Sequence, residues 1–446
     1  MRRDSPMARL ALGAYTVAGR LAVPLVRRRR RHFRDTAMAR ERGGRIELPA
    51  AVTATPERYW LHGASVGELR AAPPLVAELA RRRPAAVVVA SALTDTGLDT
   101  ARALEGVAAA FALPLDLPAP VARALDRVRP TALLVLETEL WPRLVASCAE
   151  RSIPVIVLNG KLSPAATRRY RRLAPLFRPL AGALTGVAAQ SRADAQRYAE
   201  LGVDPDRIAV TGSSKIDVTP PAPGSGATGE PVAGRPLVVA GSVRRGEEHW
   251  VLTAWRRVAS SPALPPPLLV VAPRHLDQAG RMEHAARRLG LAVCRRSSLA
   301  PALEAALEAA AHGGHDVLVL DTLGELAGLY ARATVAIVGG GFVEARGHNL
   351  LEPAMVGLPV LFGPRHVAVA DEDRALEVAG GGWRVDSIDV LGERLGALLA
   401  NPAACAEAGR RARRATGQLR GAAARALDRV DAWLGWASGT TSPGGP

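Results

Sequence analysis

Short apolar runs alternate with longer amphipathic stretches along most of the chain. From about residue 57 onward, each apolar run is followed by turn residues and then by an Ala-, Arg- and Leu-rich stretch with helical spacing. This alternation is typical of βαβ units around a parallel sheet, so we expect an α/β fold. The expected strands of the first half are Tyr59–Leu61, Ala86–Ala90, Ala132–Leu136, Val155–Leu158, Gly186–Ala189 and Ile208–Val210. Those of the second half are Leu237–Ala240, Leu268–Ala272, Ala292–Cys294, Val317–Leu320, Val335–Val338 and Pro359–Phe362.

A segment rich in proline, glycine and small residues separates the two series of strands. It runs from Thr219 to Pro236 and has the composition of an interdomain linker. The chain of 446 residues is also too long for one ordinary core. We therefore expect one Rossmann-like domain over 40–218 and a second over 237–436, facing across a cleft, and a disordered tail over 437–446.

The N-terminal 34 residues combine an apolar stretch with a basic block. Residues 8–26 form an apolar stretch broken by Arg9 and Arg20, and Arg27 to Arg31 with Arg34 follow them. The apolar run is shorter than a spanning helix requires, and strong charge after the run favours retention with the block on the cytoplasmic side. We expect a membrane-associated helix at the cytoplasmic face of the inner membrane. The alternative is a helix that packs on the protein while its arginines are solvated.

The overall charge favours an anionic partner. The net charge is +16, but aromatic residues make up only 4% of the chain and form no stripe with basic residues, so nucleic acid is disfavoured. A phosphorylated or membrane-borne partner fits better. The three cysteines, Cys148, Cys294 and Cys405, are too widely spaced for a disulfide framework or a zinc site. No metal-binding motif occurs, and we expect neither a metal nor another cofactor.

The most informative motif is HGASVGE, which runs from His62 to Glu68 directly after an expected strand. Small residues, including Ser65 and Gly67, let backbone amides approach a ligand at the start of the helix expected near Leu69. A glutamate in this position is a candidate general base. Its structural alternative is stabilisation of the helix dipole.

Two further charged residues of the first half follow strands. The motif ETELWP places Glu137 and Glu139 after Ala132–Leu136, where at least one can point inward, although a solvated acidic turn is the alternative. Lys215 follows Ile208–Val210 and is one of only two lysines in the chain. Its compact charge suits a sugar carboxylate or a developing negative charge.

The second half carries candidates for binding a nucleotide at its own strand ends. Arg274 can grip a phosphate, and the helix after the DTLGEL motif can offer free amides to a phosphate or a base edge. Glu352 can bind ribose hydroxyls, or it can belong to a helix cap. The loop at Gly241 and Ser242 can contact phosphate or sugar, or be a plain turn. The full set is Pro273, Arg274, His275, Leu323, Gly324, Glu325, Asn349, Leu350, Leu351 and Glu352.

The motifs, taken in order, resemble those of the Kdo transferases of lipopolysaccharide assembly. HGASVGE and ETELWP are joined by TGSSKID (Thr211 to Asp217), VAPRH (Val271 to His275), DTLGELAGLY (Asp321 to Tyr330) and the stretch from Gly339 to Pro364. The resemblance implies a GT-B fold and inverting transfer of 3-deoxy-manno-octulosonic acid (Kdo) from its CMP conjugate (CMP-Kdo) to a lipid A precursor. It further implies that Glu68 deprotonates the acceptor, that Glu137 positions the reacting groups, and that no metal is needed.

Two other functions remain open from the residues themselves. One is a different enzyme with two Rossmann-like domains, such as a uridine nucleotide sugar transferase or epimerase. The other is a non-catalytic protein that binds acidic lipid through its basic N-terminus.

Overall fold

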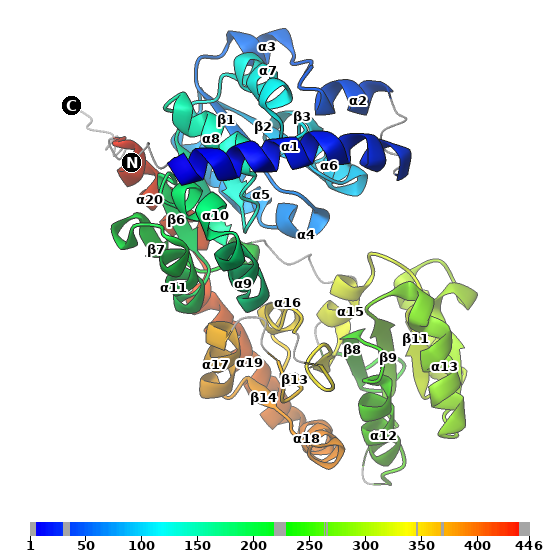
Figure 1. Ribbon diagram of the computed structural model, residues 1–446. Coiled ribbons are helices and arrows are strands. Elements are labelled where there is room, and N and C mark those ends of the chain that lie inside the picture. The colour runs from blue at the N-terminus through cyan, green and yellow to red at the C-terminus, as the bar shows by residue number, and fades with distance from the viewer. Residues whose placement is uncertain are drawn as a thin grey trace, which may run out of the picture. The chain divides into compact units, whose positions relative to one another are not determined.

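The chain folds into two compact units, each with its own parallel sheet (Figure 1). The computed structural model describes residues 6–29, 36–217, 229–262, 264, 266–344, 347–366 and 370–436. Unit 1 comprises Met1–Val218 with Arg420–Pro446, and unit 2 comprises Thr219–Leu419. Two parallel sheets flanked by helices confirm the expected α/β class.

The sheet of unit 1 has seven parallel strands in the order β3-β2-β1-β4-β5-β6-β7. The first strand lies inside the sheet, next to the middle strand β4, and the order reverses between β1 and β4, where open α/β sheets normally bind their ligands. Each expected strand of the first half is present, while β3 was not expected. The bounds are β1 Arg58–His62, β2 Val87–Ala92, β3 Val107–Ala112, β4 Ala132–Leu136, β5 Val155–Gly160, β6 Gly186–Ala189 and β7 Ile208–Val210.

Helices cover both faces of this sheet and close two hydrophobic cores. Because parallel strands are buried on both faces, β1, β4, β5 and β6 are buried along their whole length. The helices are α1 Pro6–Arg29, α2 Thr36–Arg42, α3 Ala50–Ala54, α4 Val66–Leu69, α5 Ala72–Arg82, α6 Asp95–Arg102, α7 Pro118–Val128, α8 Pro142–Glu150, α9 Pro164–Arg172, α10 Ala174–Ala181, α11 Arg192–Leu201 and α20 Ala422–Leu434, with short 3-10 turns η2 Pro205–Arg207 and η3 Ser214–Ile216.

Unit 2 repeats the plan with the strand order β10-β11-β9-β8-β12-β13-β14. The first strand is again central, and the order reverses between β8 and β12. The strands are β8 Leu237–Val243, β9 Leu268–Pro273, β10 Val293–Arg295, β11 Val317–Val319, β12 Val335–Val338, β13 Val360–Phe362 and the unexpected β14 Gly382–Arg384. The helices are α12 Glu248–Ala259, α13 Ala279–Arg288, α14 Leu303–His312, α15 Leu326–Arg332, α16 Leu351–Met355, α17 Ala370–Ala379, α18 Ile388–Ala400 and α19 Pro402–Leu419, with 3-10 turns η4 Leu276–Gln278 and η5 Arg296–Ser298.

The C-terminal boundary differs from the expected domain 237–436, because the last helix returns to unit 1. Helix α20 packs on α5, where Arg82 forms ion pairs with Asp431 (2.7 Å) and Asp428 (2.8 Å). At its start, the backbone N–H groups of Gly421 and Ala423 donate to Asp217. Of the expected linker, 219–228 lies outside the described residues, as does the expected tail 437–446.

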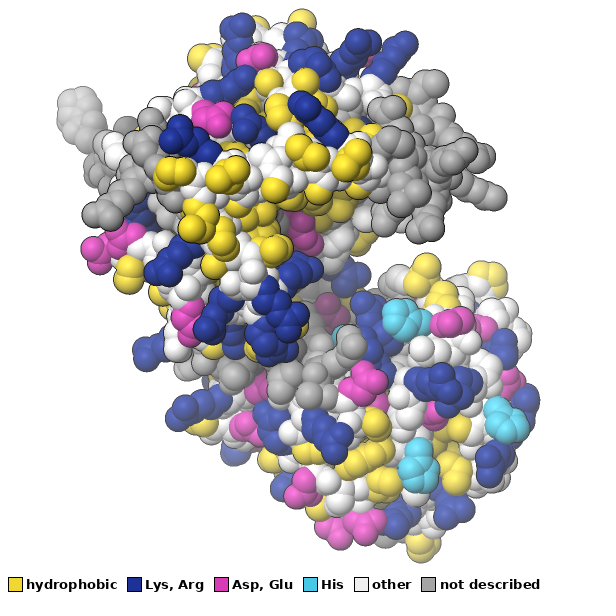
Figure 2. Space-filling view, viewed as in Figure 1, with side chains coloured by type: hydrophobic (Ala, Val, Ile, Leu, Met, Phe, Trp, Pro, Cys, Tyr) yellow, Lys and Arg dark blue, Asp and Glu magenta, His cyan; other side chains and the backbone are white. Residues whose placement is uncertain are grey.

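Helix α1 packs on unit 1 along one side and exposes apolar side chains on another. Its inner side meets α8 and α10, the Tyr15 hydroxyl is hydrogen-bonded to Asp116, and Gly19 lies against Leu117. The exposed side presents Met7, Leu10, Val17 and Leu21, each more than half accessible, and apolar atoms extend along this helix in Figure 2. Within the described part of the chain, no helix has the length and apolarity needed to cross a bilayer. The side chains of the basic block 27–31 and Arg34 lie outside the described residues.

Candidate active site

Glu68 lies in the first turn of α4, at the carboxyl end of the central strand β1. The helix begins at Val66 rather than near Leu69, with Ser65 at its N-cap. The carboxylate folds back on the loop and accepts the Ala64 backbone N–H at 2.7 Å and the Ser65 hydroxyl at 3.4 Å. Gly67 is exposed, and a Cβ at this position would contact only the Ser65 hydroxyl, at 3.8 Å. The loop therefore holds the Glu68 carboxylate in one orientation while leaving its surroundings free of bulk.

The electrostatic setting of Glu68 suits proton transfer near neutral pH. Burial raises the pKa of Glu68 to about 7, the Ala64 N–H opposes this, and the carboxylates of Glu139 and Glu137 raise it further. A glutamate that only stabilised a helix dipole would have a lowered pKa, because the dipole favours its charged form. A general base works best when its pKa lies near the working pH.

Glu137 and Lys215 form an ion pair between two strand ends. Glu137 follows β4 with φ at 58°, in the left-handed region that non-glycine residues rarely adopt, and its carbonyl accepts the Tyr198 hydroxyl at 2.6 Å. Its carboxylate meets Lys215 Nζ, in η3 after β7, at 2.6 Å. The Glu137 side chain is only 16% exposed, so it is not a solvated acidic turn.

Glu139 brings a third carboxylate to this end of the sheet, and α9 supplies its neighbours. Burial raises the pKa of Glu139, Arg169 lowers it, and Glu137 raises it again. Tyr170, next to Arg169 on α9, donates its hydroxyl to the Thr138 carbonyl at 3.0 Å. The charges of Glu139 and Glu68 both act on Tyr170, which places α9 beside the carboxylate cluster.

A buried polar network beneath these groups was not anticipated from the sequence. His62, fully buried at the end of β1, lies 2.9 Å from the Ser91 hydroxyl through Nδ1 and accepts Trp141 Nε1–H at 3.1 Å through Nε2. Trp60 Nε1–H donates to the same hydroxyl at 2.7 Å. Burial lowers the pKa of His62 to about 4, so the imidazole is neutral at pH 7. The network ties HGASVGE to ETELWP; the histidine inside the first motif was its only sequence signal.

In unit 2, basic side chains gather at the carboxyl ends of β8 and β9. Arg274 and His275 follow β9 and are exposed, as expected of ligand-binding groups, while Pro273 is buried in the strand. Arg244, after β8, donates from Nε to His348 Nε2 at 3.3 Å. Burial lowers the pKa of His348 to about 4, helped by the charges of Arg274 and Arg244. Arg244 and His348 were not among the residues singled out in the sequence.

A buried carboxylate fixes the loops that carry this basic group. Glu247 is 1% exposed and accepts backbone N–H groups of Arg244 (2.9 Å), Gly340 (2.8 Å) and Phe342 (3.0 Å). Packing requires glycine at position 241, because an added Cβ would lie 1.9 Å from the Tyr330 hydroxyl. Ser242 has φ at 57°, so this loop has a constrained backbone. These contacts account for Gly241 and Glu247 structurally.

The DTLGEL motif and the segment HNLLEP, from His348 to Pro353, are held largely by local contacts. Glu325 accepts from Arg296 at 2.7 Å and from the Thr322 hydroxyl, ahead of α15. Gly324 has φ at 88° and Leu323 is 82% exposed. Asn349 accepts the Leu351 N–H at 2.9 Å and donates to Glu352 at 3.4 Å, while Leu350 and Leu351 are buried. The Asn349 contact is a local turn just ahead of α16, whose N-cap residue Leu350 makes no side-chain cap hydrogen bond, and Glu352 is partly exposed.

The described residues hold no group of three or more side chains suited to a metal ion. The chemistry they offer is that of carboxylates at one sheet and cations at the other. The first set can accept a proton, and the second can bind a phosphate.

The chain is similar in sequence to known proteins. A family model described as 3-deoxy-D-manno-octulosonic-acid transferase (kdotransferase) matches residues 37–218. The 3-deoxy-D-manno-octulosonic acid transferase of Bordetella pertussis is 34% identical over 95% of this chain and 99% of its own length. The enzyme of the same name from Haemophilus influenzae is 28% identical over 85% of this chain and 88% of its own length.

A solved structure resembles the chain in fold. The UDP-GlcNAc 2-epimerase of Neisseria meningitidis, bound to UDP-GlcNAc, has a TM-score of 0.57 at 14% sequence identity, covering 84% of this chain and 99% of its own. This likeness extends to the two Rossmann-like sheets of the GT-B fold and not to the chemistry. The 34% identity to the Bordetella pertussis enzyme across nearly the full length of both chains shows that this chain belongs to the 3-deoxy-D-manno-octulosonic acid (Kdo) transferase family and is a glycosyltransferase.

Proposed function

We propose that this enzyme transfers Kdo from CMP-Kdo to a phosphorylated lipid A precursor with inversion, and that Glu68 is the general base. The observation that carries the proposal is the half-buried Glu68 carboxylate at the carboxyl end of β1, with its pKa raised to about 7. In the transfer, Glu68 takes the proton of the acceptor hydroxyl as its oxygen bonds to the anomeric carbon of Kdo. The bond from that carbon to the phosphate oxygen breaks, and CMP leaves with the electron pair.

The ion pair of Glu137 and Lys215 supports the transfer step of this reaction. The Lys215 side chain is 30% exposed although its Nζ is ion-paired with Glu137. The ammonium group can therefore also contact an anionic group of a ligand. A compact ammonium suits the carboxylate of Kdo or the charge that develops during transfer. Glu137, held by its backbone and by Lys215, then fixes the position of that ammonium.

The basic group of unit 2 supports binding of the donor. Arg274 is exposed, and its side chain makes no hydrogen bond or ion pair with any described residue. The charges of Arg274 and Arg244 both lower the pKa of His348, so the two guanidinium groups lie in the same part of unit 2. The phosphate of CMP-Kdo gains negative charge as the glycosidic bond breaks, and guanidinium groups stabilise it most where charge develops. Backbone amides around Gly324 and the carboxylate of Glu352 then serve the nucleoside.

We also propose that the enzyme works at the cytoplasmic face of the inner membrane. Helix α1 supports this location, because its inner side is fixed to Asp116 and Leu117 while Met7, Leu10, Val17 and Leu21 face outward. A helix held in this way can lie in a lipid surface through its apolar side. Such a location would bring the enzyme to its lipid acceptor.

A transfer assay read by mass spectrometry tests the reaction directly. The wild-type enzyme with CMP-Kdo and a tetraacylated lipid A precursor should add the mass of Kdo to the lipid, and the same assay with uridine nucleotide sugars should give no product. Transfer from a uridine nucleotide sugar, or none from CMP-Kdo, would refute the proposal.

Arg274→Gln tests the donor site, with Arg245→Gln as the control because Arg245 is also exposed after β8 but does not act on His348. Loss of a charged hydrogen bond to phosphate should weaken CMP binding by about tenfold or more. Calorimetric titration with CMP measures the difference. Equal affinities of the two variants would remove Arg274 from the site.

A further inference from the structure

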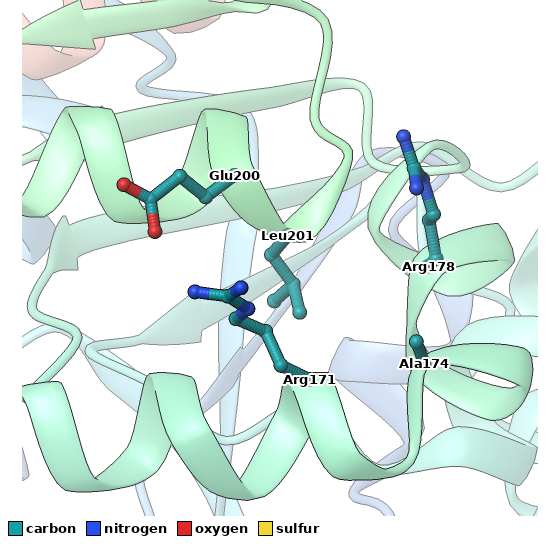
Figure 3. Close-up of a pocket in the computed structure, with 5 residues that line it drawn as sticks. All are labelled: Arg171, Ala174, Arg178, Glu200 and Leu201. Carbon is teal, nitrogen blue, oxygen red and sulfur yellow. The ribbon is translucent and has the colours of Figure 1, made fainter.

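Unit 1 has an open cavity of about 370 Å³ that the proposed reaction does not use. Three helices form it: α9 contributes Arg171, α10 contributes Ala174 and Arg178, and α11 contributes Glu200 and Leu201. Figure 3 shows Arg171 and Glu200 on one side of Leu201, with Ala174 and Arg178 on the other. The cavity is large enough for a small ligand group and combines charged walls with an apolar base.

The charged groups of this cavity lack the pairing seen elsewhere in unit 1. Arg82 and Arg197 are ion-paired with neighbouring carboxylates, but neither Arg171 nor Arg178 has a side-chain partner among the described residues. Glu200 accepts only a 3.4 Å hydrogen bond from Gln196 there. Two guanidinium groups and one carboxylate are thus available to a ligand.

The backbone makes room for one of the arginines. Gly202, which ends α11 with φ at 110°, lies beside the aliphatic part of Arg178, and a Cβ in its place would be 2.8 Å from Arg178 Cγ. A purely structural role for Arg178 would be to cap the carbonyl groups at the end of α11. Its guanidinium group, however, donates to no described acceptor. Arg178 is therefore placed over the cavity with its donors unused.

The position of the cavity relates it to a lipid surface. Helix α10, which carries Arg178, packs on α1, whose exposed apolar side is described above. Leu173, between α9 and α10, adds an apolar side chain that is 50% exposed. In Figure 2, apolar atoms along and below α1 adjoin a group of basic side chains, as at a protein surface that meets phospholipid.

We propose that this cavity binds the phosphoethanolamine headgroup of a membrane phospholipid. The phosphate would lie between the guanidinium groups of Arg171 and Arg178, and the ammonium would meet Glu200. Leu201 and Ala174 would contact the carbon atoms between them. A group that is only anionic would leave Glu200 beside negative charge, and a choline headgroup has no N–H to donate to it. The inference rests on the proposed membrane location and not on the transfer reaction.

Binding of the full-length enzyme to vesicles without net charge tests this assignment. Vesicles of phosphatidylcholine alone are compared with vesicles that contain phosphatidylethanolamine in phosphatidylcholine, so that nonspecific attraction of arginines to anionic lipid is absent. Wild-type enzyme should bind the ethanolamine-containing vesicles about tenfold more tightly in a sedimentation assay. Arg171→Gln/Arg178→Gln should lose this preference, and so should Glu200→Gln.

The matched control is Arg168→Gln/Arg172→Gln, which removes the same charge from exposed positions of α9 outside the cavity. This variant should keep the preference. Ethanolamine lipids also loosen headgroup packing, which α1 could sense by itself. If the cavity variants kept the wild-type preference, α1 would be its source and the assignment would be wrong.

A soluble ligand separates the cavity from the membrane location. O-phosphoethanolamine should perturb the NMR signals of wild-type residues that line the cavity more than phosphocholine or inorganic phosphate does at equal concentration. Equal perturbation by inorganic phosphate would mean that Glu200 plays no part, and the headgroup assignment would fail. Neither assay depends on turnover, so failure of the proposed Kdo transfer would leave both results unchanged.

Discussion

Glu68 and Glu247 occupy comparable places in the two units but have opposite surroundings. Each lies where the central first strand of its sheet, β1 or β8, gives way to a helix. Glu68 accepts one backbone N–H and is half buried near two other carboxylates. Glu247 is 1% exposed and accepts backbone N–H groups from three residues.

The contrast shows how one fold supplies two kinds of carboxylate. Glu247, which accepts backbone N–H groups from three residues, connects the loops that follow β8 and β12. A glutamate that is desolvated with fewer donors keeps a high pKa and remains available. The number of N–H groups that each carboxylate accepts thus differs between the proposed base, Glu68, and Glu247, which joins loops.

The largest effect should come from Glu68→Gln. If Glu68 is the base as proposed, the variant should lose about 10²- to 10⁴-fold in turnover while CMP binding, which we propose for unit 2, stays the same. Steady-state kinetics and a CMP titration measure the two properties separately. A Glu68→Gln enzyme with normal turnover would break the comparison, because Glu68 would then be structural as well.

Stability should respond in the opposite way at the two glutamates. Glu247→Gln places an amide among backbone N–H donors and should cost about 1–3 kcal/mol of unfolding free energy. For Glu68, a pKa raised from 4.5 to about 7 means that the folded state holds its proton longer, so this residue's contribution to stability falls as pH rises from about 4.5 to 7. Glu68→Gln should lack that fall, as urea unfolding at several pH values would reveal. A stable Glu247→Gln protein would contradict the structural role.

Much of the fold follows from local pattern. Apolar runs such as Ala132–Leu136 and Val335–Val338 match observed strands residue for residue, because a strand buried on both faces must be continuously apolar. The unexpected strands are less distinctive: β3 is apolar throughout but mainly alanine, which has a low strand propensity, and β14 is only Gly382–Arg384. The return of α20 to unit 1 depends on Arg82 meeting Asp431, a contact between distant residues that no local pattern contains.

Part of the candidate site could also be predicted from the sequence. Strand ends placed Glu68, Glu137 and Lys215 at one edge of the sheet, since carboxyl ends of parallel strands meet there. The contacts of His62 with Trp141 and of Glu247 with Gly340 join separate loops, so spacing along the chain gave no sign of them. Sequence pattern thus locates groups at an edge, while tertiary packing decides which become paired.

The carboxylate cluster makes a smaller, signed prediction for the pH profile. Glu139→Gln removes a negative charge that raises the pKa of Glu68, and it leaves the charge of Arg169 unopposed. Both changes favour the ionised base, so the rise of kcat/KM with pH should move to lower pH, by roughly half a unit. Glu150→Gln, at the far end of α8, should leave the profile in place. A shift to higher pH would contradict the arrangement of charges around Glu68.

The smallest effect should come from Trp141→Phe, which keeps an aromatic ring but removes the donor to His62 Nε2. The buried acceptor then lacks its partner, which should cost about 1–3 kcal/mol of unfolding free energy and reduce turnover only a few-fold as ETELWP loosens.

Wild-type His62, with its pKa lowered from 6.5 to about 4, should make the protein less stable as pH falls through that interval. Freeing Nε2 to take a proton should weaken this acid sensitivity. Trp433→Phe is the control, because Trp433 Nε1 has no hydrogen-bond partner among the described residues. If thermal unfolding between pH 4 and pH 6.5 were alike in both variants, the contact with His62 would not be what holds ETELWP beside Glu68.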